Sequence, residues 1–215
     1  MLYIVSSPIG NLKDITFRAV ETLQTVEKIY CEDTRRTKIL LEHYHIVKPL
    51  ESYHHHSDYK IPSIVKELKA GKNLAYLSDA GTPGIADPAG KLVAAARQAA
   101  VEVVPIPGAS SVTAILSVAG IYANAYQFWG YVPTKKGRET FIKELLVAKL
   151  PVVFFETAPR LQKFFTQVKE LGGGSQWFLV GRELTKQFEE IASGTPEELS
   201  THFATPKGEF VIVKL

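Results

Sequence analysis

The first half of the chain alternates short apolar runs with amphipathic stretches. Four apolar segments are rich in strand-forming side chains and run into polar or turn-forming residues: 2–5, 28–31, 74–77 and 101–106. Between them, apolar positions recur at the spacing of a helix, for example at 17–26 and 37–44. Strands that alternate with helices predict right-handed crossovers and a mostly parallel sheet.

The second half predicts another α/β domain, with antiparallel strands. A helix of small residues is expected at 112–120 and an aromatic strand at 126–132. Further strands are expected at 152–156, 177–180, 189–194 and 210–215, and helices at 138–147, 161–171 and from Thr195 onward. We therefore predict an α/β fold of two domains, residues 1–112 with a mostly parallel sheet and residues 113–215 with a mixed sheet.

Composition and charge narrow the class of protein. The 215 residues are 46% hydrophobic and 22% charged, which is typical of a globular protein and excludes a disordered or collagen-like chain. The net charge of +3 permits an anionic partner without requiring one. The single cysteine, Cys31, cannot form an internal disulfide and the first residues do not resemble a secretory leader, so we expect a cytoplasmic protein. No apolar run approaches the ~20 residues that cross a bilayer, so no membrane partner is expected.

Three of the expected strand ends carry glycine, proline, serine or aspartate: residues 6–11, 78–84 and 107–111. The carboxyl ends of neighbouring parallel strands face one crevice, so we expect these loops to converge on a ligand. Asp79 can accept hydrogen bonds from ribose hydroxyls, which favours a nucleoside-like ligand. Any one of these loops taken alone is more often explained by ordinary turn chemistry.

The common nucleotide and metal motifs are absent. The sequence has no G-x-x-x-x-G-K-[ST], no G-x-G-x-x-G after the first strand, no C-x-x-C and no H-E-x-x-H. Adjacent side chains of an extended segment point to opposite sides, so only His54 and His56 of the three consecutive histidines share a face. We predict no metal site there and expect contact with phosphate or sugar, or a solvated loop.

Two further strand ends concentrate charge. The sequences EDTRR (32–36) and RELTK (182–186) each follow an expected strand. Arginine can bind phosphate through two parallel hydrogen bonds, although a helix cap with a solvated face explains residues 32–36 equally well. The aromatic residues of 126–131 could stack on bases, but at this alternating spacing they are more often part of a core.

Seven blocks of the sequence resemble, in this order, the branch of the tetrapyrrole methylase family that modifies ribosomal RNA. They are SPIGNLKDIT (7–16), CEDTR (31–35), SYH (52–54), SDAGTP (78–83), PIPGAS (105–110), RELTK (182–186) and KGE (207–209). The resemblance spans essentially the whole chain. It implies two α/β domains with S-adenosylmethionine bound in the cleft between them, and a homodimer. It also implies 2'-O-methylation of a cytidine ribose in the 16S rRNA of the small ribosomal subunit.

The resemblance also assigns residues by position. Those implied to contact the methyl donor are Pro8, Ser78, Asp79, Ala80, Ile85, Ser110, Ser111, Glu156, Leu184 and Lys207. On the acceptor side we predict catalytic roles for Asp33, His54 and Lys186, and substrate contacts for Arg35, Arg36, His56 and Arg182. A ribose hydroxyl is a poor nucleophile until its proton is removed, so Asp33 or His54 is expected to be the base. The sequence does not rank these two, and Arg35 and Lys186 are expected on phosphates.

Two alternatives stay open. One is a methylase of the same fold that acts on a small, precorrin-type tetrapyrrole, since an anionic macrocycle and an RNA would both suit a basic cleft. The other is a non-catalytic factor that binds the ribosome. The set of donor-loop residues argues against the second alternative, because a pure RNA-binding module does not need them.

Overall fold

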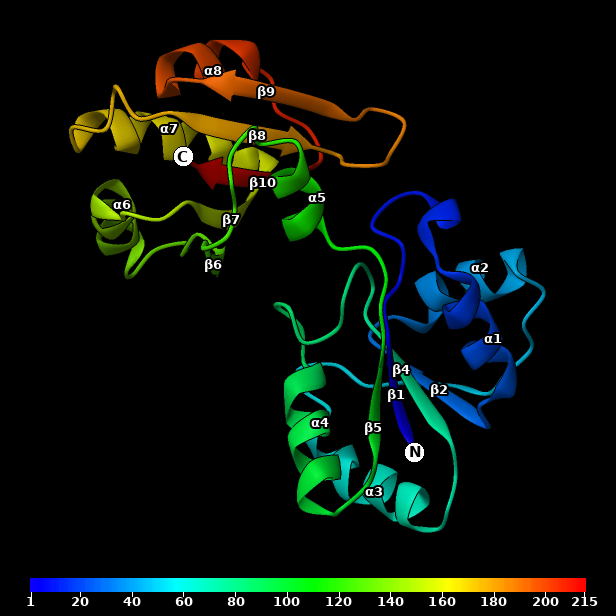
Figure 1. Cartoon of the computed structure of the whole chain (residues 1–215). Coiled ribbons are helices and arrows are strands. Elements are labelled where there is room, and N and C mark those ends of the chain that lie inside the picture. Colours follow the sequence, from blue (N-terminus) through cyan, green and yellow to red (C-terminus); the bar gives the residue numbers. More distant parts are fainter. The chain divides into compact units, whose positions relative to one another are not determined.

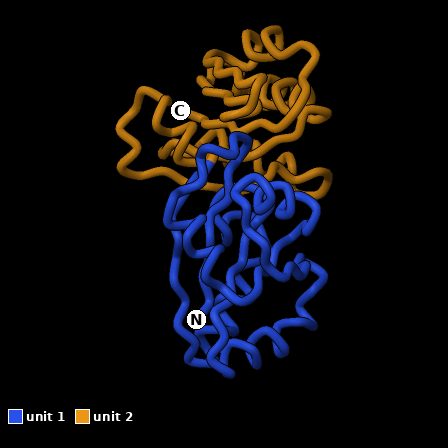
Figure 2. Tube along the Cα trace, turned by 90° about the vertical axis from the view of Figure 1, so that its right-hand side faces the viewer, with its two compact units in different colours: residues 1–110 blue, residues 111–215 orange.

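The structure, a computed structural model, describes residues 1–215. The chain divides into two compact units, residues 1–110 and residues 111–215, which are coloured separately in Figure 2. The domain boundary expected at residue 112 falls in the first turn of helix α5 (Ser111–Ser117). No helix is both long and apolar enough to cross a membrane.

The first unit is a parallel sheet of five strands in the order β3-β2-β4-β1-β5. The strands are β1 Leu2–Val5, β2 Lys28–Cys31, β3 Leu50–Ser52, β4 Leu74–Leu77 and β5 Val103–Ile106. The helices are α1 Phe17–Thr25, α2 Thr34–His43, α3 Ile61–Lys69 and α4 Ala89–Gln98, and the 3-10 turns are η1 Leu12–Asp14 and η2 Asp58–Lys60. The parallel sheet predicted from the alternating pattern is confirmed.

The helices of this unit cover opposite faces of the sheet (Figure 1). Leu23 of α1 and Leu41 of α2 pack in one core cluster, whereas Ile64 of α3 and Leu92 of α4 pack in another. From β1 the chain crosses toward β2, and from the neighbouring β4 it crosses the other way, toward β5. Right-handed crossovers in opposite directions place their helices on opposite faces. The sheet therefore has a topological switch point between β1 and β4, where open α/β sheets bind ligands.

Two details of the first unit differ from the expected elements. Helix α2 begins at Thr34 rather than Thr37, because the Asp33 side chain accepts a hydrogen bond from Arg35 N and caps the helix three residues earlier. Strand β3 was not expected from the sequence. It has only three residues, all of them half-buried, so it carries no readable alternation.

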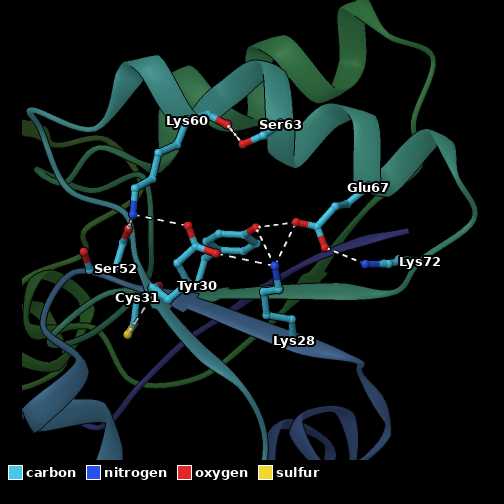
Figure 3. A network of polar contacts seen from close by, with 9 residues as sticks. Lys28, Tyr30, Cys31, Ser52, Lys60, Ser63, Glu67 and Lys72 are labelled. Carbon is cyan, nitrogen blue, oxygen red and sulfur yellow. Dashed lines mark hydrogen bonds and ion pairs between the residues drawn. The ribbon is translucent and has the colours of Figure 1, made fainter.

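A polar network joins β2, β3 and α3 at the amino end of β2 (Figure 3). Lys28 Nζ lies 2.8 Å from Glu67 Oε1, Tyr30 Oη donates to the same oxygen at 2.9 Å, and Lys72 Nζ lies 2.8 Å from Glu67 Oε2. The hydrogen bonds from Lys28 and Lys72 lower the pKa of Glu67 to about 2. Since this network lies at the opposite end of β2 from the loop that begins at Glu32, it stabilises the sheet and is remote from the ligand loops.

The second unit contains a mixed sheet in the order β6-β7-β10-β8-β9. Its strands are β6 Gln127–Tyr131, β7 Val152–Thr157, β8 Phe178–Arg182, β9 Glu190–Gly194 and β10 Glu209–Lys214. After α5, its helices are α6 Arg138–Val147, α7 Ala158–Glu170 and α8 Pro196–His202. Only β6 and β7 pair in parallel, which confirms the predicted mixed sheet. Fully buried phenylalanines, among them Phe154, Phe164 and Phe178, form its core.

Candidate active site

The loops that follow β1, β4 and β5 are joined to one another by hydrogen bonds. Ser7 N donates to Gly81 O at 3.0 Å, and Gly81 N donates back to Ser7 O at 3.1 Å. Ser7 Oγ also donates to Ser78 O at 2.9 Å, and Thr82 Oγ1 donates to Ala109 O at 3.1 Å. The three loops that were expected to converge therefore lie together at the carboxyl edge of the sheet, at its switch point.

Glycine permits this close approach at two positions. A Cβ atom on Gly108 would lie 2.7 Å from Ser6 Cβ, closer than real side chains come, so the loops after β1 and β5 could not pack this way with any other residue. Gly81 has a φ of 78°, in the left-handed region that favours glycine. Both glycines thus serve the packing and turn geometry of these loops, in agreement with the explanation by ordinary turn chemistry.

The loop after β2 joins the same site through a reciprocal pair of hydrogen bonds. Asp33 N donates to Asp79 Oδ1 at 3.0 Å, and Asp79 N donates to Glu32 Oε1 at 2.9 Å. Arg36 Nη1 adds a 3.4 Å ion pair to Asp79 Oδ2. Two residues expected on the acceptor side, Asp33 and Arg36, thereby lie beside Asp79, which was expected to contact the donor.

Glu32 is a member of this site that the sequence analysis did not select. Burial raises the pKa of its carboxyl group, and the hydrogen bond from Asp79 N offsets this only in part. The signal was available in the sequence, because Glu32 stands in the same EDTRR block as Asp33 and directly follows β2. What the sequence could not show is its partner, since Asp79 lies 47 positions further along the chain.

The loop after β4 keeps groups that a nucleoside-like donor would need. A carboxylate can accept about four hydrogen bonds, and that of Asp79, with 29% of its side chain exposed, still has acceptor capacity beside Asp33 N and Arg36. Ile85 is an apolar side chain that is 45% exposed, and Ala80 is exposed as well. A carboxylate with acceptor capacity thus lies in the same loop as exposed apolar groups, and Pro8 and Ser110 lie in the adjoining loops.

The two expected bases have different surroundings. Asp33 accepts hydrogen bonds from Arg35 Nε at 3.0 Å and Nη2 at 2.6 Å, in addition to Arg35 N. These contacts with Arg35 lower the pKa of Asp33 to about 2, so its carboxylate is a weak proton acceptor. The same contacts occupy part of the Arg35 guanidinium that was expected on a phosphate.

His54 lies in the exposed loop after β3, with His55 and His56. His56 N donates to His54 Nδ1 at 3.3 Å, so the neutral His54 ring has its hydrogen on Nε2. The rings of His54 and His56 are 6.0 Å apart, and no group of three or more His, Cys, Asp or Glu side chains suited to a metal ion is found in the chain. The ring lone pair that could accept a proton is therefore the one on Nδ1, which receives the hydrogen bond from His56 N.

In the second unit, Glu156 is buried in an ion triad. Its Oε2 lies 2.9 Å from Arg138 Nη1 and its Oε1 lies 2.5 Å from Arg160 Nη2, while Thr157 N donates to Oε1 at 2.8 Å. The Glu156 side chain is fully buried and that of Arg138 is 4% exposed. Both carboxylate oxygens are therefore engaged within the unit, and the residue as a whole is only 1% exposed.

The other expected residues of the second unit gather at one end of its sheet. Arg182 Nε donates to Lys207 O at 2.8 Å, and the buried Leu184 lies between Glu183 and Thr185. Glu183 and Thr185 have left-handed φ values of 49° and 66°, and such strain often accompanies function when it occurs in residues other than glycine.

Lys186 also belongs to this end of the sheet. Its Nζ lies 3.0 Å from Glu183 Oε1 and 2.8 Å from Glu209 Oε2. Burial alone lowers the pKa of Lys186, but the hydrogen bonds to Glu209 and Glu183 outweigh it and raise the pKa above its ordinary value. Lys186 therefore stays charged at neutral pH.

The chain thus consists of two α/β units, and the loops of the first unit are joined at the switch point of its sheet, where open α/β sheets bind ligands. The model of the family of tetrapyrrole (corrin/porphyrin) methylases matches residues 1–200, and the chain belongs to this family. It is 42% identical to the ribosomal RNA small subunit methyltransferase I of Synechocystis sp., over 99% of this chain and 78% of that protein.

Solved structures show the same fold. Diphthine synthase superposes with a TM-score of 0.74 at 17% identity, covering 100% of this chain and 89% of that one. The uroporphyrin-III C-methyltransferase of Thermus thermophilus, solved in complex with S-adenosylhomocysteine, superposes with a TM-score of 0.67 at 15% identity, covering 99% and 96%. These likenesses confirm the predicted two-domain methylase fold.

Proposed function

We propose that this protein transfers a methyl group from S-adenosylmethionine to the 2'-hydroxyl of a cytidine ribose in 16S rRNA. The observation that carries the proposal is the 42% identity, over 99% of the chain, to a ribosomal RNA small subunit methyltransferase I. The joined loops of the first unit support it, because they surround Asp79 with exposed apolar groups. We further propose that the enzyme is a cytoplasmic homodimer that acts on the small ribosomal subunit.

The donor would be held by the joined loops of the first domain, residues 1–112, and by residues of the second domain, 113–215. When bound, it supplies an electrophilic methyl group for in-line transfer. Asp79 would accept hydrogen bonds from its ribose, Ile85 and Ala80 would provide apolar contact, and Ser78 and Pro8 would shape the backbone around it. Further contacts are proposed for Ser110, Ser111, Leu184, Lys207 and the Glu156 backbone. Alignment of the methyl group with the hydroxyl is the main contribution that such a site can make.

We assign the general base to His54 rather than to Asp33. The pKa of Asp33 is held at about 2, so this carboxylate takes a proton from a ribose hydroxyl poorly. His54 Nδ1, whose lone pair accepts a 3.3 Å hydrogen bond from His56 N, is the atom that would take the proton. Asp33 instead holds Arg35, and Arg36, His56, Arg182 and Lys186 would face the phosphates of the RNA.

Methyl transfer to defined acceptors tests the proposal. The protein is incubated with methyl-labelled S-adenosylmethionine and, separately, with small ribosomal subunits that lack the modification, naked 16S rRNA, or a precorrin-type tetrapyrrole. Donor binding is measured in parallel by calorimetry. We expect label on the ribosomal acceptor and none on the tetrapyrrole. Label on the tetrapyrrole alone would mean that the acceptor is a tetrapyrrole and not RNA. Absence of both donor binding and methyl transfer would favour a non-catalytic ribosome-binding factor.

A further inference from the structure

Glu32 occupies a position that ordinary stability does not explain. Its carboxylate is half-buried, and Asp79 and Asp87 both face it closely enough to raise its pKa in addition to burial. Gathering three carboxylates costs free energy through desolvation and like-charge repulsion. Arg36 pairs only with Asp79, at 3.4 Å, and its side chain is 62% exposed, while His55 and the hydrogen bond from Asp79 N lower the pKa of Glu32 only in part. Ionisable groups whose pKa values are shifted by burial and by neighbouring charges are concentrated at functional sites of proteins.

The geometry defines what Glu32 does. Its Oε1 accepts the hydrogen bond from Asp79 N at 2.9 Å, and Asp79 Oδ1 in turn accepts from Asp33 N at 3.0 Å. Each loop therefore satisfies a backbone N–H of the other, so that the end of β2 and the end of β4 hold one another in register. The Asp79 backbone is fixed by Glu32, and the direction of the Asp79 side chain depends on that backbone.

We propose that Glu32 is a positioning residue that sets the affinity for the methyl donor by holding Asp79 through the Asp79 backbone N–H. This rests on the proposed function, in which Asp79 contacts the donor ribose. Glu32 acts through its Oε1, which accepts the hydrogen bond from Asp79 N, and the rate measurement below separates this role from that of a base. The same pair of hydrogen bonds also links the loop after β4, which contains Asp79, to the segment from Asp33 to Arg36.

The role predicts a particular pattern among variants. In Glu32→Ala the Asp79 N–H loses its partner, so donor binding is expected to weaken about tenfold, which is the effect of one charge-assisted hydrogen bond. At saturating donor, the single-turnover rate should stay within about threefold of the unchanged protein. Glu32→Gln keeps an oxygen that accepts from Asp79 N, so it should restore donor binding to within about threefold. Loss of a general base would instead lower the rate by 100-fold or more, and glutamine would not restore it.

Glu67→Ala is the matched control. Glu67 is also a half-buried, ion-paired glutamate of the first unit, but its partners lie at the amino end of β2. This variant should lose stability while keeping the donor affinity of the unchanged protein. Circular dichroism and thermal unfolding of every variant establish that the fold is retained at the assay temperature.

The experiment is calorimetric titration with S-adenosylmethionine, followed by single-turnover transfer to small ribosomal subunits. Weak binding by Glu32→Ala with restoration by Glu32→Gln supports the positioning role. Equal donor affinity of Glu32→Ala and the unchanged protein overturns it, and so does a 100-fold lower rate at saturating donor in both variants. If the unchanged protein binds no donor, the proposed function fails. This outcome is distinct from a failure of the positioning role of Glu32, in which the unchanged protein and Glu32→Ala both bind the donor equally well.

Discussion

The buried triad around Glu156 provides the sharpest test of the structural assignments in the second unit. Replacing Glu156 with glutamine keeps the volume of the side chain but removes its charge. Arg138, 4% exposed, then remains in the interior without its anion, and Arg160 loses its partner as well. Removing one member of a buried ion pair typically costs 3–5 kcal/mol. Because the glutamine oxygen still accepts one hydrogen bond, we expect a loss of about 3 kcal/mol in the free energy of unfolding.

Urea unfolding followed by tryptophan fluorescence measures this loss selectively. The two tryptophans of the chain, Trp129 and Trp177, both belong to the second unit, so their emission reports on its unfolding. With a urea m-value of about 2 kcal/mol/M, the midpoint should fall by about 1.5 M. Glu139→Gln is the control, because Glu139 is 65% exposed in its pair with Lys143 and its replacement should leave the urea midpoint nearly unchanged. A loss below 1 kcal/mol for Glu156→Gln would refute the assignment of the triad as a buried structural unit.

Three further predictions concern the first unit. Gly108→Ala should lower the free energy of unfolding by about 1–3 kcal/mol and weaken donor binding, because the added Cβ would lie 2.7 Å from Ser6 Cβ in the loop after β1. Gly90→Ala in α4 is the control, because a Cβ there would have no atom within 4 Å. It should leave thermal stability unchanged or raise it slightly. The folded-state pKa of Glu67, about 2, lies below its ordinary value of 4.5, so its stabilising effect is present above pH 4.5 and is lost as the pH falls toward 2. Glu67→Gln should therefore be less stable than the unchanged protein at pH 7. The difference between their urea midpoints, measured by circular dichroism, should shrink as the pH falls from 4.5 toward 2. A difference that stays constant over this range would contradict the ion pairing of Glu67. Asp33→Asn should leave the shape of the pH–rate profile between pH 5 and 9 unchanged, since a carboxyl with a pKa of about 2 is ionised throughout, whereas His54→Ala should lower the single-turnover rate 100-fold or more.

Much of the fold could be predicted because local pattern and tertiary structure agree. The apolar runs at 2–5, 28–31 and 74–77 became strands with these same bounds, and the capping box of Thr195 and Glu198 starts α8 as its sequence indicates. Edge strand β3 escaped prediction because three half-buried residues do not form a periodic pattern. The early start of α2 depended on the choice of cap, which the sequence left open between several polar residues.

The candidate site could be predicted only in part. The loops at the carboxyl edge were identified because strand order brings their turn-forming residues together. The partners of individual charged side chains could not be predicted, since these partners lie far away in the sequence. Arg138, which engages Glu156, lies 18 positions away, and the fact that Glu32 holds the Asp79 backbone emerges only when β2 and β4 are neighbours. The sequence also could not separate Asp33 from His54 as bases, because that distinction depends on how the Arg35 side chain folds back onto the Asp33 carboxylate.

Nucleoside analysis of the methylated RNA tests the central claim most directly. Small ribosomal subunits lacking the modification are methylated with labelled donor, the RNA is digested to nucleosides, and the labelled product is fragmented in a mass spectrometer. Transfer to the ribose 2'-hydroxyl predicts a methylated cytidine that loses an unmodified cytosine base, with the label retained on the sugar. Label that leaves with the base, or that appears on a nucleoside other than cytidine, would contradict the account.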